Sequence, residues 1–261
     1  MEISLFVSRK HIYSDHPKQF FMKKVLFFSA SLVLFLIFEQ SCSKKNAAAP
    51  ACQLITISDV NGSTTTTYNL TYNNEGKIST LQSISGSTTT SKVFTYSGNV
   101  IFVTTTYSGS ANQTTDSIVV NSAGLITSDQ NRSGTNQSLT TYTYSGNQLL
   151  KSILQNNSNP PVTTTYTFTN GDLTGSTDGT TTSTYSYNTS KTSVQGDYFQ
   201  LVQLIQYGAS FVINSHQIIG YQVGSTIENI TYTYDNTGKI TGLIGTTGGN
   251  IETITLQYNC N

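Results

Sequence analysis

The sequence has little charge, no tryptophan, four prolines, three cysteines and three histidines among its 261 residues. Asp, Glu, Lys and Arg together make up 10% of the chain. This composition excludes coiled coils and helical bundles, which are rich in charged helix-forming residues. From Cys42 onward eight basic residues face ten acidic ones, a net charge of −2. A nucleic-acid partner is therefore excluded, because phosphate contacts need a basic surface.

Residues suited to catalysis or metal binding are equally scarce. After the first 21 residues the chain has one histidine, His216, which lies in a strand-like apolar stretch at 211–219. Ser215 precedes it, but no Gly-x-Ser-x-Gly motif marks a serine nucleophile. The chain also lacks Cys-x-x-Cys, paired histidines and an Asp-x-Asp-x-Asp-Gly calcium loop. The sequence predicts no enzyme, no metal site and no cofactor.

The residues that are abundant favour β-structure. Threonine makes up roughly a fifth of the chain after Ala51, and the sequence contains 16 tyrosines and 20 glycines. β-branched and aromatic side chains suit a pleated, half-buried surface, while glycine suits tight turns. We therefore expect an all-β protein.

The N-terminal region has the pattern of an export signal. Met22 and two lysines precede an uncharged run at 25–38, which is shorter than the roughly 20 residues of a membrane-spanning helix. Cys42 follows, and then a polar tether at 43–50. This arrangement resembles a bacterial lipoprotein signal. The resemblance implies cleavage before Cys42 and acylation of its thiol; the alternative is an ordinary secretory peptide with an unmodified cysteine.

These features predict the organisation and location of the chain. We expect a leader at 1–41 with translation starting at Met22, a lipidated tether at 42–51 and one β-domain at 52–261. The lipid on Cys42 would attach the protein to a membrane of the cell envelope, namely the outer membrane. The side of that membrane is left open.

An aromatic-x-aromatic pair followed by a turn recurs along the β-domain. The second member of the pair falls at positions 72, 96, 120, 144 and 168, a constant spacing of 24, which returns at Tyr234 and Tyr258. Twenty-four residues accommodate two strands of about nine residues with two short connections. Along each strand apolar and polar residues alternate, as at 254–258, so one face of the sheet is apolar. We predict an antiparallel meander of about sixteen strands, curved or rolled to bury that face.

The best-preserved turn contains Tyr234, Asp235 and Gly238, within 232–240. It resembles the YD repeats of Rhs-type β-shell proteins, and is similar to YD-like domains of uncharacterised Gram-negative envelope lipoproteins. The resemblance covers 68–258 and implies a rolled β-domain with no assigned activity.

The repeat is interrupted before residue 223. Asp197 is a helix-capping residue, Gly208 is a terminating one, and the apolar residues between them fall on one helical face. We predict a short helix or compact loop at 197–207; the alternative is another pair of buried strands.

Two further features concern covalent chemistry. Cys52 and Cys260 stand at the two ends of the repeat domain, and export makes them candidates for a disulfide that joins the first strand to the last. In an open sheet they would instead remain free thiols. Asp116-Ser117-Ile118 resembles an O-glycosylation signal of some envelope proteins, which implies a sugar on Ser117.

Two functions fit this sequence. The first is a lipid-anchored structural or interaction domain that contacts an unknown envelope protein. The second is a lipid-anchored binding module for a glycan or other small ligand, with a pocket between the sheet and 197–207. A concave patch of aromatic residues outside the repeat, such as Tyr107, Tyr198 and Tyr221, would favour a ligand. A featureless threonine face would favour a protein partner.

Overall fold

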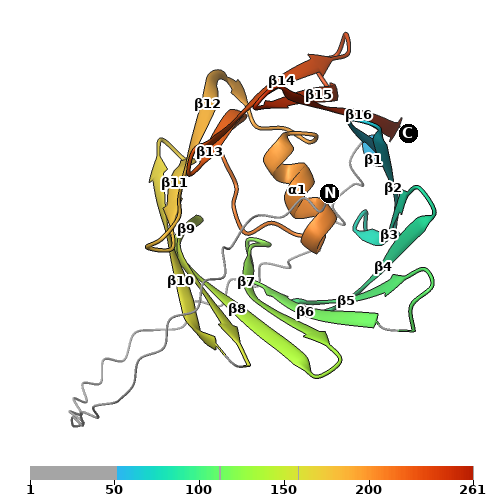
Figure 1. Ribbon diagram of the computed structural model, residues 1–261, viewed down its shortest axis with the longest axis vertical. Helices are drawn as coiled ribbons and strands as arrows, with labels where there is room; N and C mark the ends of the chain where they lie inside the picture. The colour runs from blue at the N-terminus through green and yellow to red at the C-terminus, as the bar shows by residue number, and fades with distance from the viewer. Residues whose placement is uncertain (1–51, 112, 158, 261) are drawn as a thin grey trace, which may run out of the picture.

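Sixteen antiparallel strands follow one another along the part of the chain that the computed structural model describes, residues 52–111, 113–157 and 159–260 (Figure 1). The strands are β1 (Cys52–Asn61), β2 (Thr64–Tyr72), β3 (Ile78–Ser85), β4 (Thr88–Ser97), β5 (Val100–Tyr107), β6 (Gln113–Val120), β7 (Ile126–Ser133), β8 (Asn136–Ser145), β9 (Gln148–Asn156), β10 (Asn159–Thr169), β11 (Asp172–Thr177), β12 (Thr182–Thr192), β13 (His216–Val223), β14 (Thr226–Tyr234), β15 (Ile240–Thr247) and β16 (Asn250–Cys260). A helix, α1 (Tyr198–Tyr207), lies between β12 and β13. The predicted leader and tether, including Cys42, fall outside these ranges.

The sheet closes on itself. β16 pairs with β1 along a register that runs from Cys52↔Cys260 to Asn61↔Glu252. The predicted all-β antiparallel meander of about sixteen strands is confirmed, and the sheet closes into a barrel rather than only curving or rolling. Closure pairs the two strands that would otherwise expose unsatisfied backbone groups at the sheet edges.

The turns of the repeat are built by side chains that bond to their own backbone. The Asp235 carboxylate accepts the N–H groups of Thr237 and Lys239 at 2.9 and 3.0 Å, and Gly238 has a φ of 85°. Asn73 and Asn121 make the same pair of bonds in their turns. Asparagine thus replaces the aspartate without changing the turn, because both side chains offer an acceptor oxygen at the same place.

Tyrosine hydroxyls link each repeat to the one before it. The hydroxyls of Tyr72, Tyr96 and Tyr144 each donate to a carbonyl 18 residues earlier, on the preceding repeat, at 2.6 to 2.8 Å. The strand register shifts at the second aromatic residue of several pairs, for example next to Tyr72 and Tyr144. The 24-residue period therefore reflects a repeated contact inside the barrel wall.

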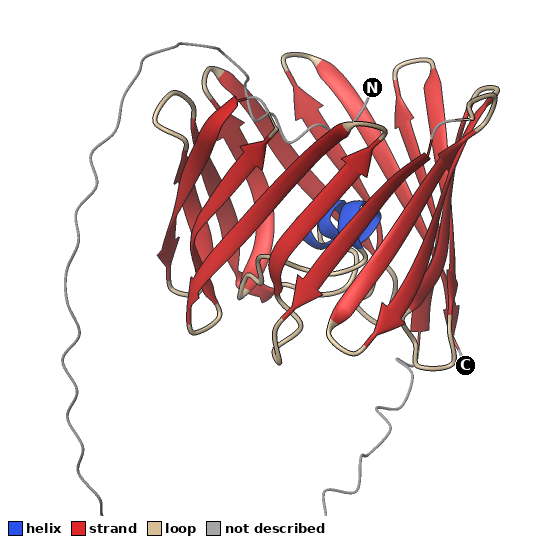
Figure 2. Ribbon diagram, turned by 90° about the horizontal axis from the view of Figure 1, so that it is seen from below, coloured by secondary structure: helices blue, strands red, loops and turns tan. Residues whose placement is uncertain are grey.

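Helix α1 lies inside the barrel, where the closed ring of strands surrounds it (Figure 1, Figure 2). Asp197 caps its first turn by accepting the Phe199 N–H at 3.1 Å, and Gly208 ends it in the left-handed conformation with a φ of 64°. The predicted helix is confirmed. Sixteen strands enclose more space than wall side chains alone can fill, so the helix supplies the missing core. In the described part of the chain, no helix is long and apolar enough to cross a membrane.

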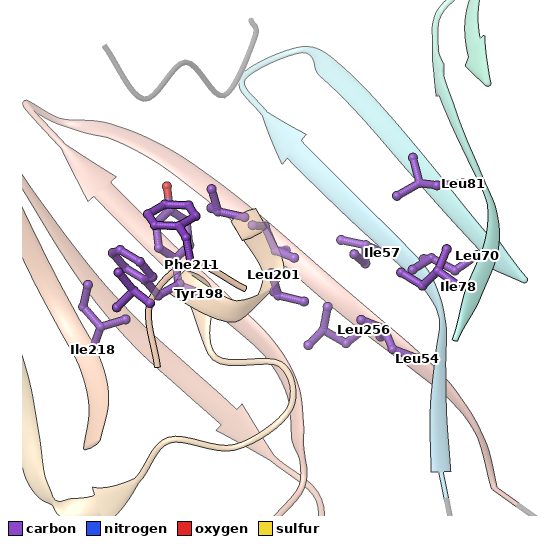
Figure 3. Close-up of a cluster of buried hydrophobic side chains, with 14 of the residues drawn as sticks. Leu54, Ile57, Leu70, Ile78, Leu81, Tyr198, Leu201, Phe211, Ile218 and Leu256 are labelled. Carbon is purple, nitrogen blue, oxygen red and sulfur yellow. The ribbon is translucent and has the colours of Figure 1, made fainter. Parts of the chain in front are cut away.

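The core joins the helix to the wall. Leu201 of α1 packs in one buried cluster with Leu54 and Leu256, which lie on the two strands of the seam (Figure 3). Phe211, from the segment that follows the helix, belongs to the same cluster. Burying each such side chain stabilises the fold by about 1.5–3 kcal/mol.

The segment after the helix is held by Gln203, a buried residue of α1. Its Oε1 accepts the N–H groups of Phe211 and Val212 at 2.7 and 2.9 Å, and its Nε2 donates to the carbonyls of Phe199 and Val212. One side chain thus satisfies four backbone groups that have no water nearby. The helix and the following segment therefore form one unit, here called the plug, which comprises residues 197–215.

The outer face of the barrel is rich in threonine, with exposed apolar residues such as Phe102 and Leu150 among the polar ones. Along β10 the exposed positions 163, 165, 167 and 169 are all threonine, while the alternate positions carry Val162, Thr164, Tyr166 and Phe168. On β16 the outward residues are Ile251, Thr253, Thr255 and Gln257, and Ile254 and Leu256 face inward. The alternation expected from the sequence thus directs the repeat tyrosines and the buried aliphatic side chains to the interior, and most threonines of β10 and β16 to the outside.

Candidate ligand-binding pocket

A cavity of about 280 Å³ lies inside the barrel between the plug and strands β8–β12. Its aromatic lining consists of Tyr142, Tyr166 and Tyr185 from the wall and Phe199, Tyr207 and Phe211 from the plug. The volume is close to the lower limit for small-molecule sites, which are about 300–1,000 Å³. The sequence-based expectation placed a pocket between the sheet and 197–207, where this cavity is found.

The aromatic rings hold one another in place. Tyr142 stacks on Phe211 with ring centroids 5.6 Å apart, and Tyr207 meets the same ring edge-on at 5.8 Å. Tyr185 packs edge-on against Phe199, also at 5.8 Å. Offset and edge-on pairs of this kind are favourable beyond their buried area. The pocket therefore has a pre-formed aromatic floor.

Hydroxyl groups and the aliphatic side chains of Leu154, Val162 and Leu173 line the rest of the cavity. Ser152 shares a hydrogen bond of 2.9 Å with the Tyr166 hydroxyl, and Ser176 lies 3.4 Å from the Tyr185 hydroxyl. Burial raises the pKa of Tyr166 and that of Tyr142 above the ordinary value, so both phenols are neutral at physiological pH. Neutral hydroxyls can each donate and accept.

The cavity carries almost no charge. Of the residues that line it, the one with a charged side chain is Asp178, and that carboxylate already accepts the N–H groups of Thr180 and Thr181 at 2.8 and 2.7 Å. Desolvation acts to raise the pKa of Asp178, but the hydrogen bonds from Thr181 and Thr180 together outweigh it and hold the pKa below its usual value. No lysine or arginine lines the cavity. The pocket therefore offers no counter-charge for an anionic ligand such as a phosphate.

One acceptor in the pocket has no partner. The Oε1 atom of Gln206, in the last turn of α1, is buried and receives no hydrogen bond from the described residues. The carbonyls of Ile205 and Gln206 are instead satisfied by Lys92, whose Nζ donates to them at 2.9 and 3.0 Å. A buried amide oxygen without a donor is destabilising by about 1–3 kcal/mol. The Gln206 oxygen is thus enclosed by the protein, although other atoms of the residue line the cavity.

Acidic side chains gather elsewhere in the barrel wall. Asp59 lies on β1, Glu252 on the adjacent β16, and Glu228 on β14, which is separated from β16 by β15; burial raises the pKa of Asp59 and of Glu252. The nearby carboxylates Asp59 and Glu228 raise the pKa of Glu252 further. Over the described ranges, no group of three or more His, Cys, Asp or Glu side chains is arranged to hold a metal ion. Asp59, Glu228 and Glu252 are not part of the pocket lining.

The other residues singled out from the sequence lie outside the pocket. His216 donates its backbone N–H to Asp172 and places Nδ1 2.6 Å from the same carboxylate. No described hydrogen bond links the His216 ring to a serine, so the contact joins β11 to β13 without forming a triad. Ser117 is a half-buried residue within β6, paired with Phe102 and Gln130. Its predicted glycosylation stays a prediction.

Cys52 and Cys260 form a disulfide at one end of the β1–β16 seam. The Nζ atom of Lys239 lies 3.2 Å from the Cys260 sulfur. The bond links the first and last strands of the described barrel, 208 residues apart in sequence.

The tyrosines outside the repeat are distributed differently from the expectation. Tyr107 is exposed, but Tyr198 is buried and Tyr221 is half-buried, with the rings of the last two stacked at 5.8 Å. A concave patch of exposed aromatic residues outside the repeat, which would have favoured a ligand, therefore includes neither Tyr198 nor Tyr221. The pocket instead uses repeat tyrosines together with Tyr207 and Phe211, a combination that the spacing alone could not reveal.

The fold and pocket define a closed antiparallel β-barrel with an internal helical plug. Two solved structures share this fold: a porin-like protein from Bacteroides uniformis, with a TM-score of 0.57 and 14% identity over 79% of this chain and 96% of that chain, and a porin-like protein from Bacteroides vulgatus, with a TM-score of 0.53 and 16% identity over 79% and 98%. Neither a family model nor a curated protein sequence matches the chain.

The resemblance to YD-repeat, Rhs-type domains is wrong. The fold is a closed barrel similar to the porin-like structures, whereas the resemblance implied a rolled domain. The Tyr-Asp turn misled because a side-chain-capped turn after an inward tyrosine suits any antiparallel meander, whichever way its ends meet.

Proposed function

We propose that this protein is a non-catalytic binding module of the cell envelope that takes a small neutral ligand into its barrel. The observation that carries the proposal is the pre-formed, uncharged cavity between the plug and β8–β12, with its aromatic floor and hydroxyl walls. Pockets of this composition bind small molecules by apolar contact and orient them with a few polar groups.

The proposed attachment is through a lipid on Cys42, with the barrel itself in water. Barrels that span a membrane present an outward apolar band with aromatic girdles and a polar interior. Here the outward positions of β10 are threonines, the repeat tyrosines point inward, and an outward aromatic residue such as Phe102 pairs with the polar residues Thr95 and Ser117. The polar side chains at these outward positions support a barrel that has the topology of the porin-like structures but lies outside the bilayer.

Replacing Cys42 distinguishes attachment through a lipid from insertion of the barrel itself into the membrane. A chain that carries Cys42→Ser and is exported from a cleavable secretory signal in place of residues 1–41 is expected in the soluble fraction, because the proposed lipid is then absent. Fractionation of cells that express each form measures this. Retention of the variant in detergent-extractable membrane would contradict a barrel that stands in water.

Ligand uptake can be tested with N-phenyl-1-naphthylamine, a neutral dye that fluoresces in apolar pockets. Thr164→Trp fills the cavity and is expected to abolish dye fluorescence, whereas Thr165→Trp, one residue along β10, points outward and should leave it unchanged. The parent chain has no tryptophan, so each variant also reports on its own fold. Equal dye binding by both variants would overturn the proposed pocket.

The alternative function, an interaction domain for another envelope protein, has one observation in its favour. Ile227, Ile244 and Ile251 are exposed on the neighbouring strands β14, β15 and β16. Their apolar surface interrupts the threonine-rich exterior and would suit a protein contact.

A further inference from the structure

We infer that the pocket binds its neutral ligand together with a proton, which is taken up by a charged cluster, Lys92, Asp116 and Asp129, in the barrel wall beside the plug. The inference rests on the proposed function, because it assigns a form of regulation to the site that the cavity provides. Three observations carry it: the cluster holds the plug, it borders the cavity, and it contains two carboxylates for one cation.

The cluster lies on the inward face of strands β4, β6 and β7. Asp129 is paired across the sheet with Ile118, which is fully buried. Asp116 is paired with Asn131, whose Nδ2 donates to the Asp116 carboxylate at 2.5 Å. Residues that stand directly opposite each other on two strands share one face of the sheet. Both carboxylates therefore belong to the barrel interior.

Lys92 connects this cluster to the plug. Its Nζ atom donates to the carbonyls of Ile205 and Gln206, in the last turn of α1, at 2.9 and 3.0 Å. The last carbonyls of a helix have no partner within the helix and carry the negative end of its dipole, so a cation is favourable there. Burial lowers the pKa of Lys92, and the carboxylates of Asp116 and Asp129 act in the opposite direction. The contact between the wall and the plug therefore depends on the charge of the two aspartates.

The same cluster borders the cavity. Asp129 is paired with Thr140 of β8, and Thr140 lines the cavity. The titratable groups that face Asp129 from the other elements are Tyr142 of β8 and Tyr207 of α1, which also line the cavity, and Tyr166 of β10 interacts with both. Burial raises the pKa of Tyr207, and the Asp129 carboxylate raises it further. The charge of Asp129 is thus felt at the cavity wall.

Two carboxylates share one ammonium group in this cluster. The Oδ1 atom of Asp129 is buried and has no hydrogen-bond partner among the described residues. Burial raises the pKa of Asp129, the Asp116 carboxylate raises it further and Lys92 lowers it, which leaves a pKa of about 7. Burial also raises the pKa of Asp116, but the bond from Asn131 and the charge of Lys92 lower it. Asp129 is therefore the member of the cluster that gains or loses a proton near neutral pH.

A neutral ligand that fills the cavity displaces the water within it. Loss of that water removes solvation from the neighbouring Asp129 carboxylate and disfavours its charged form. Ligand binding then raises the pKa of Asp129, and by reciprocity protonation of Asp129 raises the affinity for the ligand. The affinity is therefore highest in acid and falls as the pH rises through the pKa of Asp129.

Two variants separate this effect from a change in overall stability. Asp129→Asn places a neutral side chain of the same shape at the position, so it should bind at every pH as the parent does in acid. Glu252→Gln is the matched control, because burial raises the pKa of Glu252 to about 7 as well, while the residue lies on β16 and outside the cavity lining. Its titration alters the stability of the fold without changing the charge beside the cavity.

The experiment measures the affinity of the exported protein for N-phenyl-1-naphthylamine by fluorescence between about pH 5.5 and 8.5, a range centred on the pKa of Asp129. We expect the affinity of the parent and of Glu252→Gln to fall about three- to tenfold across this range, and that of Asp129→Asn to stay constant. Calorimetry of the parent in buffers of different ionisation enthalpy should show proton uptake on binding near pH 7. This second measurement needs no variant, so it decides the question even if Asp129→Asn does not fold.

Each other outcome has a definite meaning. Dye binding that neither depends on pH nor takes up a proton would overturn the inference and leave the proposed function standing. Absence of dye binding at every pH would overturn the proposed function as well. A pH dependence that persists in Asp129→Asn would overturn the role of Asp129 and point to Asp197, the cap of α1, because burial raises the pKa of Asp197 to about 6. A pH dependence lost in Glu252→Gln would show an effect on the whole fold and would overturn the inference too.

Discussion

Replacement of both Cys52 and Cys260 by serine is expected to lower the free energy of unfolding by about 5 kcal/mol. The disulfide joins residues 208 positions apart, so it closes nearly the whole domain into one loop. In the chain-entropy model a loop of this length removes a large share of the freedom of the unfolded chain. The effect therefore acts on the unfolded state.

The folded barrel should survive the substitution. β1 and β16 remain paired from Gln53↔Asn259 to Asn61↔Glu252, so the seam is held by its backbone ladder as well. We expect the same far-ultraviolet circular dichroism for the double-serine domain and the parent, with a lower denaturation midpoint in guanidinium chloride for the double-serine form.

Two controls make this result specific. Reducing agent should lower the midpoint of the parent to that of the double-serine form and leave the variant unchanged. Thiol titration of the denatured, unreduced domain should find Cys52 and Cys260 blocked. Two free thiols there would refute the bridge, and the expected stability difference would go with it.

Gln203→Leu is expected to lower the free energy of unfolding by roughly 3–5 kcal/mol. The substitution nearly conserves side-chain volume, so packing alone predicts little change. It removes the partner of the Phe211 and Val212 N–H groups and of the Val212 carbonyl, all of them away from water. Each orphaned buried group is destabilising by about 1–3 kcal/mol.

Gln200→Leu is the matched control for this prediction. Gln200 lies one turn earlier on α1 and makes one bond, from its Nε2 to the Ser193 hydroxyl at 3.0 Å. Its loss is expected to change stability by less than about 1 kcal/mol. Urea unfolding followed by near-ultraviolet circular dichroism of the tyrosines would measure both variants, and equal destabilisation of the two would contradict the role assigned to Gln203.

Loss of the Gln203 bonds should also disturb the pocket. Phe211 stacks on Tyr142 in the cavity floor, and its backbone position depends on Gln203. The plug therefore connects the stability of the core with the shape of the ligand site.

Local features of the fold could be predicted because local physics decides them. Alternation of apolar and polar residues sets strand faces, and a capping side chain with a following glycine sets a turn, as at Asp235 and Gly238. The helix at 197–207 was predictable in the same way from Asp197 and Gly208. These signals act over a few residues and do not depend on the rest of the chain.

The roles of Gln200, Gln203 and Gln206 show where such reasoning ends. The three residues are identical and evenly spaced on one helix. Gln200 bonds to Ser193, Gln203 holds the segment after the helix, and the buried amide oxygen of Gln206 has no donor among the described residues. Only the surroundings of each side chain distinguish them. The sequence offered no signal for these differences beyond the spacing itself.

The sequence by itself determined the strand number, the repeat, the turns, the helix and the inward direction of the aromatic face, because each follows from the order of neighbouring residues. The tertiary structure alone decided that the sheet closes, that the helix lies inside it and that a neutral cavity remains beside the plug. Closure depends on the small twist and stagger of every strand pair, summed over sixteen strands, until β16 meets β1. No short segment of the sequence determines this cumulative twist and stagger, so the closed barrel and its pocket form only in the complete fold.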